Sequence, residues 1–385
     1  MGQIRRLSKA NYQDIFSLSQ FAFQYYLNPD QFAKKEKEAE RHEIWGYIVD
    51  EQLAGKLHHI PLRVLINGTS LKMGGVSSVA TWPEYRRQGI AKKLLLHSLQ
   101  EMKKAGETIS YLHPFHVGFY RKYGWELAFS NKNYTIPIER LKRKWDGNGY
   151  IRRNRNLELL QEIYTKYASK FNGMLERDKK WWEQRVLTDE EAQVAIAYNN
   201  VDAAEGYIIY KVKDDIFTAK EVAYTSINGQ HVLYEFIANH DSMAEKVKLT
   251  VPENDLLPYM IDDPTFDQEV EPYFMARIVD VLAFLKQYIF PVDGVIQLQV
   301  EDEFLLDNNG VYVIRSDNGE TFVTKMEGKG DGNIKCSIQQ LVAICLGYKR
   351  PTELFEYGLL EGDRASIELL EKMIPKTQTF LTDFF

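Results

Sequence analysis

The chain has 385 residues, of which 44% are hydrophobic and 26% are charged. This composition is ordinary for a globular protein of two or three domains, and it excludes intrinsic disorder and collagen-like scaffolds. Only two cysteines occur, which also excludes a disulfide framework. Residues 1–150 hold 23 Lys/Arg and 14 Asp/Glu, a net charge of +9, whereas the remaining 25 and 40 give −15. The basic part suits an anionic ligand (nucleic acid, membrane lipid or a phosphorylated cofactor), although two parts of opposite charge also attract each other.

Targeting and metal-binding signals are not found in the sequence. The N-terminus, MGQIRRLSKA, lacks the apolar stretch of a signal peptide, and Arg6 stands where a myristoylation motif needs Ser or Thr. No apolar run is long enough for a membrane span. Cys336 and Cys345 form no CxxC pair, so neither zinc nor redox chemistry is indicated. We therefore expect a cytoplasmic protein with no metal.

The first part of the chain alternates helix and strand patterns. Apolar spacing predicts an α/β domain with a mixed sheet over residues 1–145. The expected helices are 11–24, 32–42 and 90–105, and the expected strands are 45–50, 53–60, 61–66, 75–81 and 108–112.

Two shifts in composition divide the rest of the chain. A basic, polar stretch over 139–156 marks the first boundary, and eight acidic residues against one basic residue between 251 and 280 mark the second. We expect a second domain over 146–274 and a third, α+β domain over 275–385. The second has a helix at 157–167 and strands at 192–196, 205–212 and 215–224. The third has a helix at 278–288 (with Met275–Asp280 also assigned to a helix), strands at 295–301, 310–316 and 321–325 joined by Asn-Gly turns, and helices at 337–346 and 366–374.

One motif in the first part of the chain indicates a binding site for an anionic ligand. Strand 76–81 leads into Arg86-Arg87-Gln88-Gly89-Ile90-Ala91 and then a long helix. The free N–H groups and positive dipole end of that helix, beside two arginines, favour a pyrophosphate site. The pattern is neither a Walker A loop nor a dinucleotide fingerprint. It resembles the R-x-x-G-x-[GA] signature with which GNAT N-acetyltransferases hold the pyrophosphate of acetyl-CoA. A basic helix start on a solvated face is the alternative.

A second segment, Phe115 to Glu126, contains Tyr120 and an aromatic-Gly-aromatic turn, Tyr123-Gly124-Trp125. It resembles the GNAT segment whose tyrosine follows a strand near the thiolate leaving group. A phenol there can protonate the leaving thiolate. The alternative is a tyrosine that only packs. His58-His59, by contrast, has no partner at metal-ligand spacing, so a solvated or packed pair is the simpler reading.

The whole chain resembles one family, the enhanced intracellular survival (Eis) family, in its length, its leading GNAT motif and its aromatic C-terminus, Thr379–Phe385. The resemblance implies an α/β (α+β) fold in which a GNAT domain, a degenerate GNAT-like domain and a sterol-carrier-protein-like domain follow one another. It also implies a homo-oligomer, trimeric or hexameric.

The resemblance assigns roles to residues of the first domain and the C-terminus. Tyr120 would be the general acid, and the carboxylate of Phe385 would be the general base. A backbone N–H near Val79 would stabilise the oxyanion. Acetyl-CoA would be held by Val79, Ala80 and Thr81 along its pantetheine arm, by Arg86, Arg87, Gln88, Gly89, Ile90, Ala91 and Lys92 at its pyrophosphate, and by Phe115 and His116 on its other side.

The expected function is acetyl-CoA-dependent transfer of an acetyl group to a primary amine of a cationic acceptor: an aminoglycoside, a polyamine or a lysine-like amine. An acidic pocket would favour such acceptors, and aromatics of 21–26 would wall it or lie in the core. Two alternatives stay open. One is a non-catalytic CoA- or lipid-binding protein that uses the sterol-carrier-like domain. The other is a nucleic-acid binder, but the basic charge gathers at one turn rather than in a stripe, so neither nucleic acid nor a membrane is the expected partner.

Overall fold

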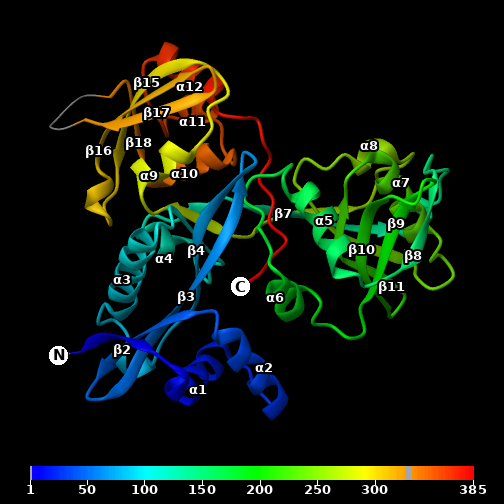
Figure 1. Cartoon of the computed structure of the whole chain (residues 1–385), viewed down its shortest axis with the longest axis horizontal. Helices are drawn as coiled ribbons and strands as arrows, with labels where there is room; N and C mark the ends of the chain where they lie inside the picture. The colour runs from blue at the N-terminus through cyan, green and yellow to red at the C-terminus, as the bar shows by residue number, and fades with distance from the viewer. Residues whose placement is uncertain (1, 327–331) are drawn as a thin grey trace.

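The computed structural model describes residues 2–326 and 332–385. Within those residues three sheets form three lobes of the molecule. Figure 1 shows the first lobe in blue and cyan, the second in green, and the third in yellow and orange. The last residues return from the third lobe to the centre, where the C-terminus lies between the first and second lobes (Figure 1).

The first sheet has seven strands in the order β1-β2-β3-β4-β5-β14-β6. Helix α3 covers it with a buried stripe of Leu94, Leu95, Leu99 and Met102, spaced as an amphipathic helix requires. The strands are β1 (Gln3–Leu7), β2 (Glu43–Val49), β3 (Gln52–Ile66), β4 (Thr69–Thr81), β5 (Ile109–Leu112), β6 (Glu126–Leu127) and β14 (Met275–Ile278). The helices are α1 (Tyr12–Phe23), α2 (Pro29–Ala39), α3 (Ile90–Ala105) and α4 (Val117–Arg121).

The second sheet has the order β13-β7-β12-β11-β10-β9-β8. Its strands are β7 (Ser130–Pro137), β8 (Gly149–Arg153), β9 (Gln193–Asn199), β10 (Ala204–Lys213), β11 (Ile216–Tyr224), β12 (Lys246–Val251) and β13 (Asp267–Pro272). Its helices are α5 (Leu157–Ala168), α6 (Lys179–Trp181), α7 (Ile227–Ala238) and α8 (Leu257–Met260). Trp181 and Trp182 are buried, as expected of adjacent tryptophans in a core.

The third sheet has the order β17-β16-β15-β18-β19. Its strands are β15 (Gly294–Glu301), β16 (Gly310–Asp317), β17 (Glu320–Lys325), β18 (Ile334–Ser337) and β19 (Glu361–Gly362), and its helices are α9 (Val281–Gln287), α10 (Ile338–Leu346), α11 (Pro351–Glu356) and α12 (Arg364–Met373). Asn318 and Gly319 turn β16 into β17 with φ of 51° and 82°, the geometry expected of an Asn-Gly hairpin. Between the sheet and α10 and α12 the core consists of the chain's own side chains, among them Leu298, Val342 and Leu370.

Two strands do not lie in the sheets that the expected domain boundaries predict for them. With boundaries at 145/146 and 274/275, β7 would lie in the first domain and β14 in the third. The backbone pairing instead places β7 between β12 and β13 of the second sheet, and β14 between β5 and β6 of the first.

The expected helix over Met275–Asp280 is wrong, because Met275–Ile278 is strand β14 and helix α9 begins at Val281. All four residues of β14 are buried, and in such a short, fully buried segment the sequence period does not separate strand from helix. Arg277 is buried there because its guanidinium pairs with the buried carboxylate of Asp302 at 2.5 Å.

Across residues 2–326 and 332–385, no helix combines the length and the hydrophobicity that crossing a membrane requires.

Candidate active site

Strand β4 is paired on both sides for only part of its length. Met73–Val76 pairs in parallel with β5, and the register with β5 ends at Val76 and Leu112. From Ser77 to Thr81, β4 keeps its neighbour β3 but has no ladder with β5 in the described chain. The stretch from Val79 to Thr81 therefore leaves alternate backbone N–H and C=O groups unpaired along one edge, which an extended ligand can pair with as an added strand.

The expected pyrophosphate segment forms the turn between β4 and α3. Gly89 is the N-cap of α3, with φ of +74°, and a Cβ added there would meet nothing within 4 Å. Arg86, Arg87, Gln88 and Lys92 are exposed, whereas Ile90 is buried in the core. Lys93 N is the first N–H that donates within the helix, to Gly89 O, so the preceding N–H groups of Ile90, Ala91 and Lys92 have no acceptor in the helix. The turn thus offers free N–H donors and cationic side chains to one anion.

Tyr120 lies on α4 and is 4% exposed. Burial raises the pKa of its phenol, so the hydroxyl keeps its proton at neutral pH. Phe115 is exposed, and its ring centroid lies 5.5 Å from that of Tyr120. His116 is exposed and caps α4, since its Nδ1 accepts a hydrogen bond from Phe119 N at 3.1 Å. The structure therefore gives His116 a helix-capping contact beside the expected cofactor edge.

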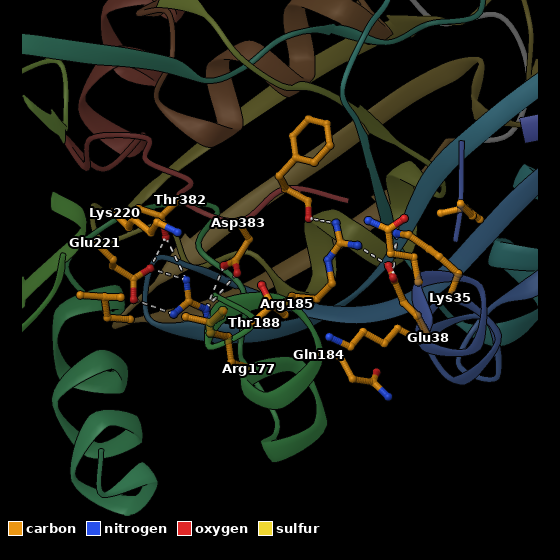
Figure 2. Close-up of a pocket in the computed structure, with 16 residues that line it drawn as sticks. Lys35, Glu38, Arg177, Gln184, Arg185, Thr188, Lys220, Glu221, Thr382 and Asp383 are labelled. Carbon is orange, nitrogen blue, oxygen red and sulfur yellow. Dashed lines mark hydrogen bonds and ion pairs between the residues drawn. The ribbon is translucent and has the colours of Figure 1, made fainter. Parts of the chain in front are cut away.

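The C-terminal segment is held in place by a buried ion-pair network. The guanidinium of Arg177, which precedes α6, donates to Asp383 Oδ1 at 2.9 Å and to Thr382 Oγ1 at 3.1 Å. The same guanidinium pairs with Glu221 of β11. Figure 2 shows these contacts converging on Arg177, and shows Arg185 beside Glu38. Arg185 also donates to the Phe384 carbonyl. The tail is therefore a fixed element of the structure and not a frayed end.

Further contacts fix the last residues. Trp181 Nε1 donates to Asp383 Oδ1 at 2.6 Å, and the hydroxyl of Tyr273 donates to the Asp383 carbonyl at 3.0 Å. The ring of Phe385 is buried, with its centroid 4.9 Å from that of Phe274. A Cβ added at Gly75 of β4 would lie 2.7 Å from Phe385 Cε2. Phe385 thus packs directly against the backbone of β4.

A pocket of about 510 Å³ gathers part of the expected site. Of the residues predicted from the sequence, Val79, Phe115, Tyr120 and Phe385 line it. Ala80, Thr81, His116 and the residues of the 86–92 turn do not line it; they lie along the β4 edge, at the α4 cap and at the start of α3. The remaining walls come from α1, α2, β3 and the residues after α6, namely Phe16, Ser19, Phe23, Tyr25, Lys35, Glu38, Ala39, His42, His58, Ile60 and Arg185, together with Val76–Ser78, His113, Pro114 and Phe384.

The charge of this pocket differs from the expected acidic lining. Among residues 2–326 and 332–385, Glu38 is the one Asp or Glu side chain that lines it, and it pairs with Lys35 and Arg185, which line it as well. Aromatic side chains are abundant instead, and Phe23 and Tyr25 are partly exposed. A second cavity of about 570 Å³ adjoins the pocket through Lys35, Glu38, Arg185 and Phe384 (Figure 2).

The sequence did not predict that three polar side chains near the site would lie together: those of Lys56, His58 and His42. His58 and His59 are a packed pair, as one reading of the sequence held, because both are buried and His59 Nε2 lies 2.6 Å from Glu107 Oε2. Lys56 is buried beside His58, with Nζ 3.2 Å from His58 Nε2. The sequence signal for Lys56 is a lysine inside an otherwise apolar strand, which becomes informative only when its partners are known.

Comparisons with known proteins agree with the three-lobed architecture. Models of the acetyltransferase (GNAT) domain match residues 3–128 and 173–278, and a sterol carrier protein domain model matches residues 281–382. An uncharacterised N-acetyltransferase of Streptomyces avermitilis is 22% identical over 62% of this chain and 63% of its own length. The N-acetyltransferase Eis of Mycobacterium tuberculosis is 22% identical over 55% of this chain and 56% of its own length. The chain thus aligns with less than two thirds of these two relatives.

Solved structures match over the full length. A probable N-acyltransferase of Enterococcus faecalis, described as a conserved protein of unknown function, superposes with a TM-score of 0.93 at 28% identity, covering 100% of both chains. Eis1 of Mycobacterium abscessus shares the fold, with a TM-score of 0.84 at 21% identity over 100% of both chains. Two GNAT domains followed by a sterol carrier protein domain, on one shared fold, define the assignment. The chain belongs to the GNAT acetyltransferases, ends in a sterol-carrier-protein-like domain, and shares its full-length fold with Eis1.

Proposed function

We propose that the protein transfers the acetyl group of acetyl-CoA to a primary amine. The observation that carries this proposal is the open edge of β4 between Ser77 and Thr81. At one end of that edge lies the exposed basic turn before α3, and at the other lies the pocket that contains Tyr120 and Phe385. A thioester on an extended arm fits this layout because its phosphates and its acyl group need different surroundings.

Binding of the donor uses the backbone more than side chains. The pantetheine arm pairs with Val79, Ala80 and Thr81. The pyrophosphate accepts the N–H groups at the start of α3 and is neutralised by Arg86, Arg87 and Lys92. Phe115, which is 71% exposed, covers the arm from the other side.

Proton transfer takes two groups. An amine is cationic at neutral pH and attacks a thioester only after losing a proton, which the C-terminal carboxylate of Phe385 accepts, directly or through water. The oxyanion is stabilised by the backbone N–H of Val79. Tyr120, which is protonated at neutral pH, then donates its proton to the CoA thiolate.

The acceptor is an amine that carries positive charge, and the walls of the pocket narrow its chemistry. Aromatic side chains such as Phe23 and Tyr25 stabilise a cation over their faces and bury an apolar body. Glu38 is already paired with two cations. We therefore propose that amines with one ammonium group beside an apolar body are better acceptors than aminoglycosides or long polyamines.

The alternative of a lipid-binding protein has less support. A lipid carrier needs an apolar cavity, whereas the third lobe packs its own Ile296, Leu346 and Met373 between sheet and helices.

A thiol assay of CoA release tests the proposal. Wild type is offered acetyl-CoA with arylalkylamines, lysine peptides, polyamines and aminoglycosides, and CoA release with at least one amine is expected. Tyr120→Phe should lower kcat about 100-fold, the range for loss of a general acid. Tyr123→Phe, a neighbouring tyrosine outside the pocket lining, is the matched control and should retain activity.

Two changes at the terminus separate the roles of Phe385. Deletion of Phe385 removes the ring and moves the carboxylate, whereas one glycine added after Phe385 keeps the ring and moves only the carboxylate. Both should lower kcat at neutral pH. Full activity of the extended chain would exclude the carboxylate as base and leave acetyl transfer intact. No CoA release with any amine would refute the enzyme proposal.

A further inference from the structure

A fully buried lysine lies beneath the active-site strand. Lys56 of β3 is 0% exposed, and its Nζ donates to Ser78 O at 3.0 Å and lies 2.6 Å from Ser78 Oγ and 3.2 Å from His58 Nε2. Within the described chain Lys56 forms no ion pair with a carboxylate, and burial alone lowers its pKa. Burying an amine without a counter-charge is costly, so this position calls for a reason beyond packing.

The partner of Lys56 is the bulge of β4. Lys56 pairs with Ala80 and His58 pairs with Ser77, so three steps along β4 face two steps along β3. The extra residue lies between Ser77 and Ala80. Ser78 has φ of 51°, in the left-handed region that a serine seldom occupies. Such a backbone persists only where surrounding contacts hold it, and Lys56 contacts both its carbonyl and its hydroxyl.

The bulge lies where the open β4 edge meets the pocket. Ser78 and Val79 both line the pocket, and from Ser77 onward β4 has left its ladder with β5. The direction of the Val79 N–H therefore depends on how the bulge is held. Ser19 of α1 adds one weak contact to Ser78, at 3.4 Å between hydroxyl oxygens. Lys56, on the neighbouring strand β3, contacts Ser78 at shorter distances than Ser19 does.

We propose that Lys56 is a positioning residue for acyl transfer: its amino group clamps the β4 bulge at Ser78 and so fixes the Val79 N–H that faces the acyl oxygen. This inference rests on the proposed function, because a fixed N–H matters only if an oxyanion forms there. Because these contacts already exist in the protein without substrate, no free energy is spent during the reaction on ordering the Val79 N–H.

Two histidines hold Lys56 from its other side. His58 Nδ1 lies 3.0 Å from His42 Nδ1, so one of these nitrogens carries a proton and donates a hydrogen bond to the other. Burial lowers the pKa of His42 to about 4, and it also lowers the pKa of His58 well below its ordinary value. Both rings are therefore neutral at neutral pH, and neutral His58 can accept an N–H from Lys56 through Nε2. The pair extends the clamp from β3 to the wall of the pocket, which His42 and His58 both line.

Steady-state kinetics of Lys56→Met test the clamp. Methionine keeps the volume of the stem and removes the amine. We expect kcat to fall about 100-fold, the loss that a misplaced reacting geometry causes, while KM for acetyl-CoA and its calorimetric Kd change less than about threefold. Lys72→Met, at an exposed lysine of the neighbouring strand β4, is the control and should behave as wild type. A substitution that merely loosened the fold would raise KM and Kd together with the loss of kcat.

Ser78→Ala gives a second, milder test if Lys56→Met does not fold. It removes one of the two Ser78 acceptors and keeps the amine, so kcat should fall about 3- to 10-fold at unchanged KM. Unchanged kcat in both folded variants, with active wild type, would overturn the clamp and leave the proposed function standing. Wild type that binds acetyl-CoA but releases no CoA with any amine would overturn the proposed function itself.

Discussion

Arg177 and Asp383 form a buried ion pair, with Arg177 Nε 2.9 Å from Asp383 Oδ1, that joins the second lobe to the C-terminal segment. Both side chains are almost wholly inaccessible, so neither charge is compensated by water. The pair lies two residues before the terminus, and its geometry decides where Phe385 can lie. A contact between distant parts of the chain thus sets the position of the proposed base.

Removing Arg177 should release the tail. Arg177→Met leaves the carboxylates of Asp383 and Glu221 buried without their cation, which costs about 3–5 kcal/mol. We expect faster removal of Phe385 by carboxypeptidase and loss of CoA release in step with that removal. Arg315→Met, which breaks an exposed pair with Asp317, is the control. Equal carboxypeptidase rates for the two variants would show that the network does not hold the tail.

Gly75→Ala should disturb the terminus from the β4 side. A Cβ there would lie 2.7 Å from Phe385 Cε2, closer than non-bonded carbons approach, so the ring must move. We expect kcat to fall about tenfold or more, since small displacements of reacting groups are costly. Phe385→Leu in the same background provides space while keeping the carboxylate and should restore part of the activity. If Gly75→Ala is as active as wild type, the ring is free to shift without effect.

Charge at the α3 turn should act on donor binding alone. Arg86→Gln and Arg87→Asn each remove one cation, and asparagine is chosen because position 87 has φ of 64°. KM for acetyl-CoA should rise about 3- to 10-fold at unchanged kcat, and the difference should shrink in high salt. Lys104→Gln, on the exposed end of α3, is the control. A loss of kcat without a change in KM would contradict a phosphate-binding role.

The lowered pKa of Lys56 should also affect how the free energy of unfolding depends on pH. Burial lowers its pKa from 10.5 to about 7. Between those values the unfolded chain binds a proton that the folded chain has lost, so the free energy of unfolding of wild type rises with pH relative to Lys56→Met. The slope is at most about 1.4 kcal/mol per pH unit. Urea unfolding of both proteins from pH 6 to pH 11 measures it, and parallel curves would show that Lys56 titrates normally.

Local patterns predicted much of the fold because they carry their own signals. Helix α3 follows from its apolar stripe and its flanking glycines, and the β16–β17 hairpin follows from its Asn-Gly turn. Strand β14 could not be recognised in the same way, because Met275–Ile278 is a strand only by pairing with β5 and β6, more than 140 residues earlier in the chain.

Some residues of the candidate site could be predicted from local sequence patterns, and others could not. The 86–92 turn and Tyr120 lie in contiguous motifs with recognisable chemistry, so they could be proposed from the sequence. Lys56 could not, because its amino group meets Ser78 only through tertiary structure, at a bulge in the pairing of β3 with β4. In the sequence Asp383 is one acidic residue in an aromatic tail, and its partner Arg177 lies 206 residues earlier. Partners brought together by tertiary structure leave no local pattern.

A crystal structure with acetyl-CoA bound tests the central claim most directly. We predict that the pantetheine arm lies along β4 from Val79 to Thr81, with the pyrophosphate at the start of α3 and the thioester carbonyl oxygen within hydrogen-bond distance of Val79 N. Tyr120 and the carboxylate of Phe385 should then lie on the side of the acyl group that faces the pocket. Acetyl-CoA bound away from β4, or a thioester turned away from that pocket, would contradict the proposed reaction.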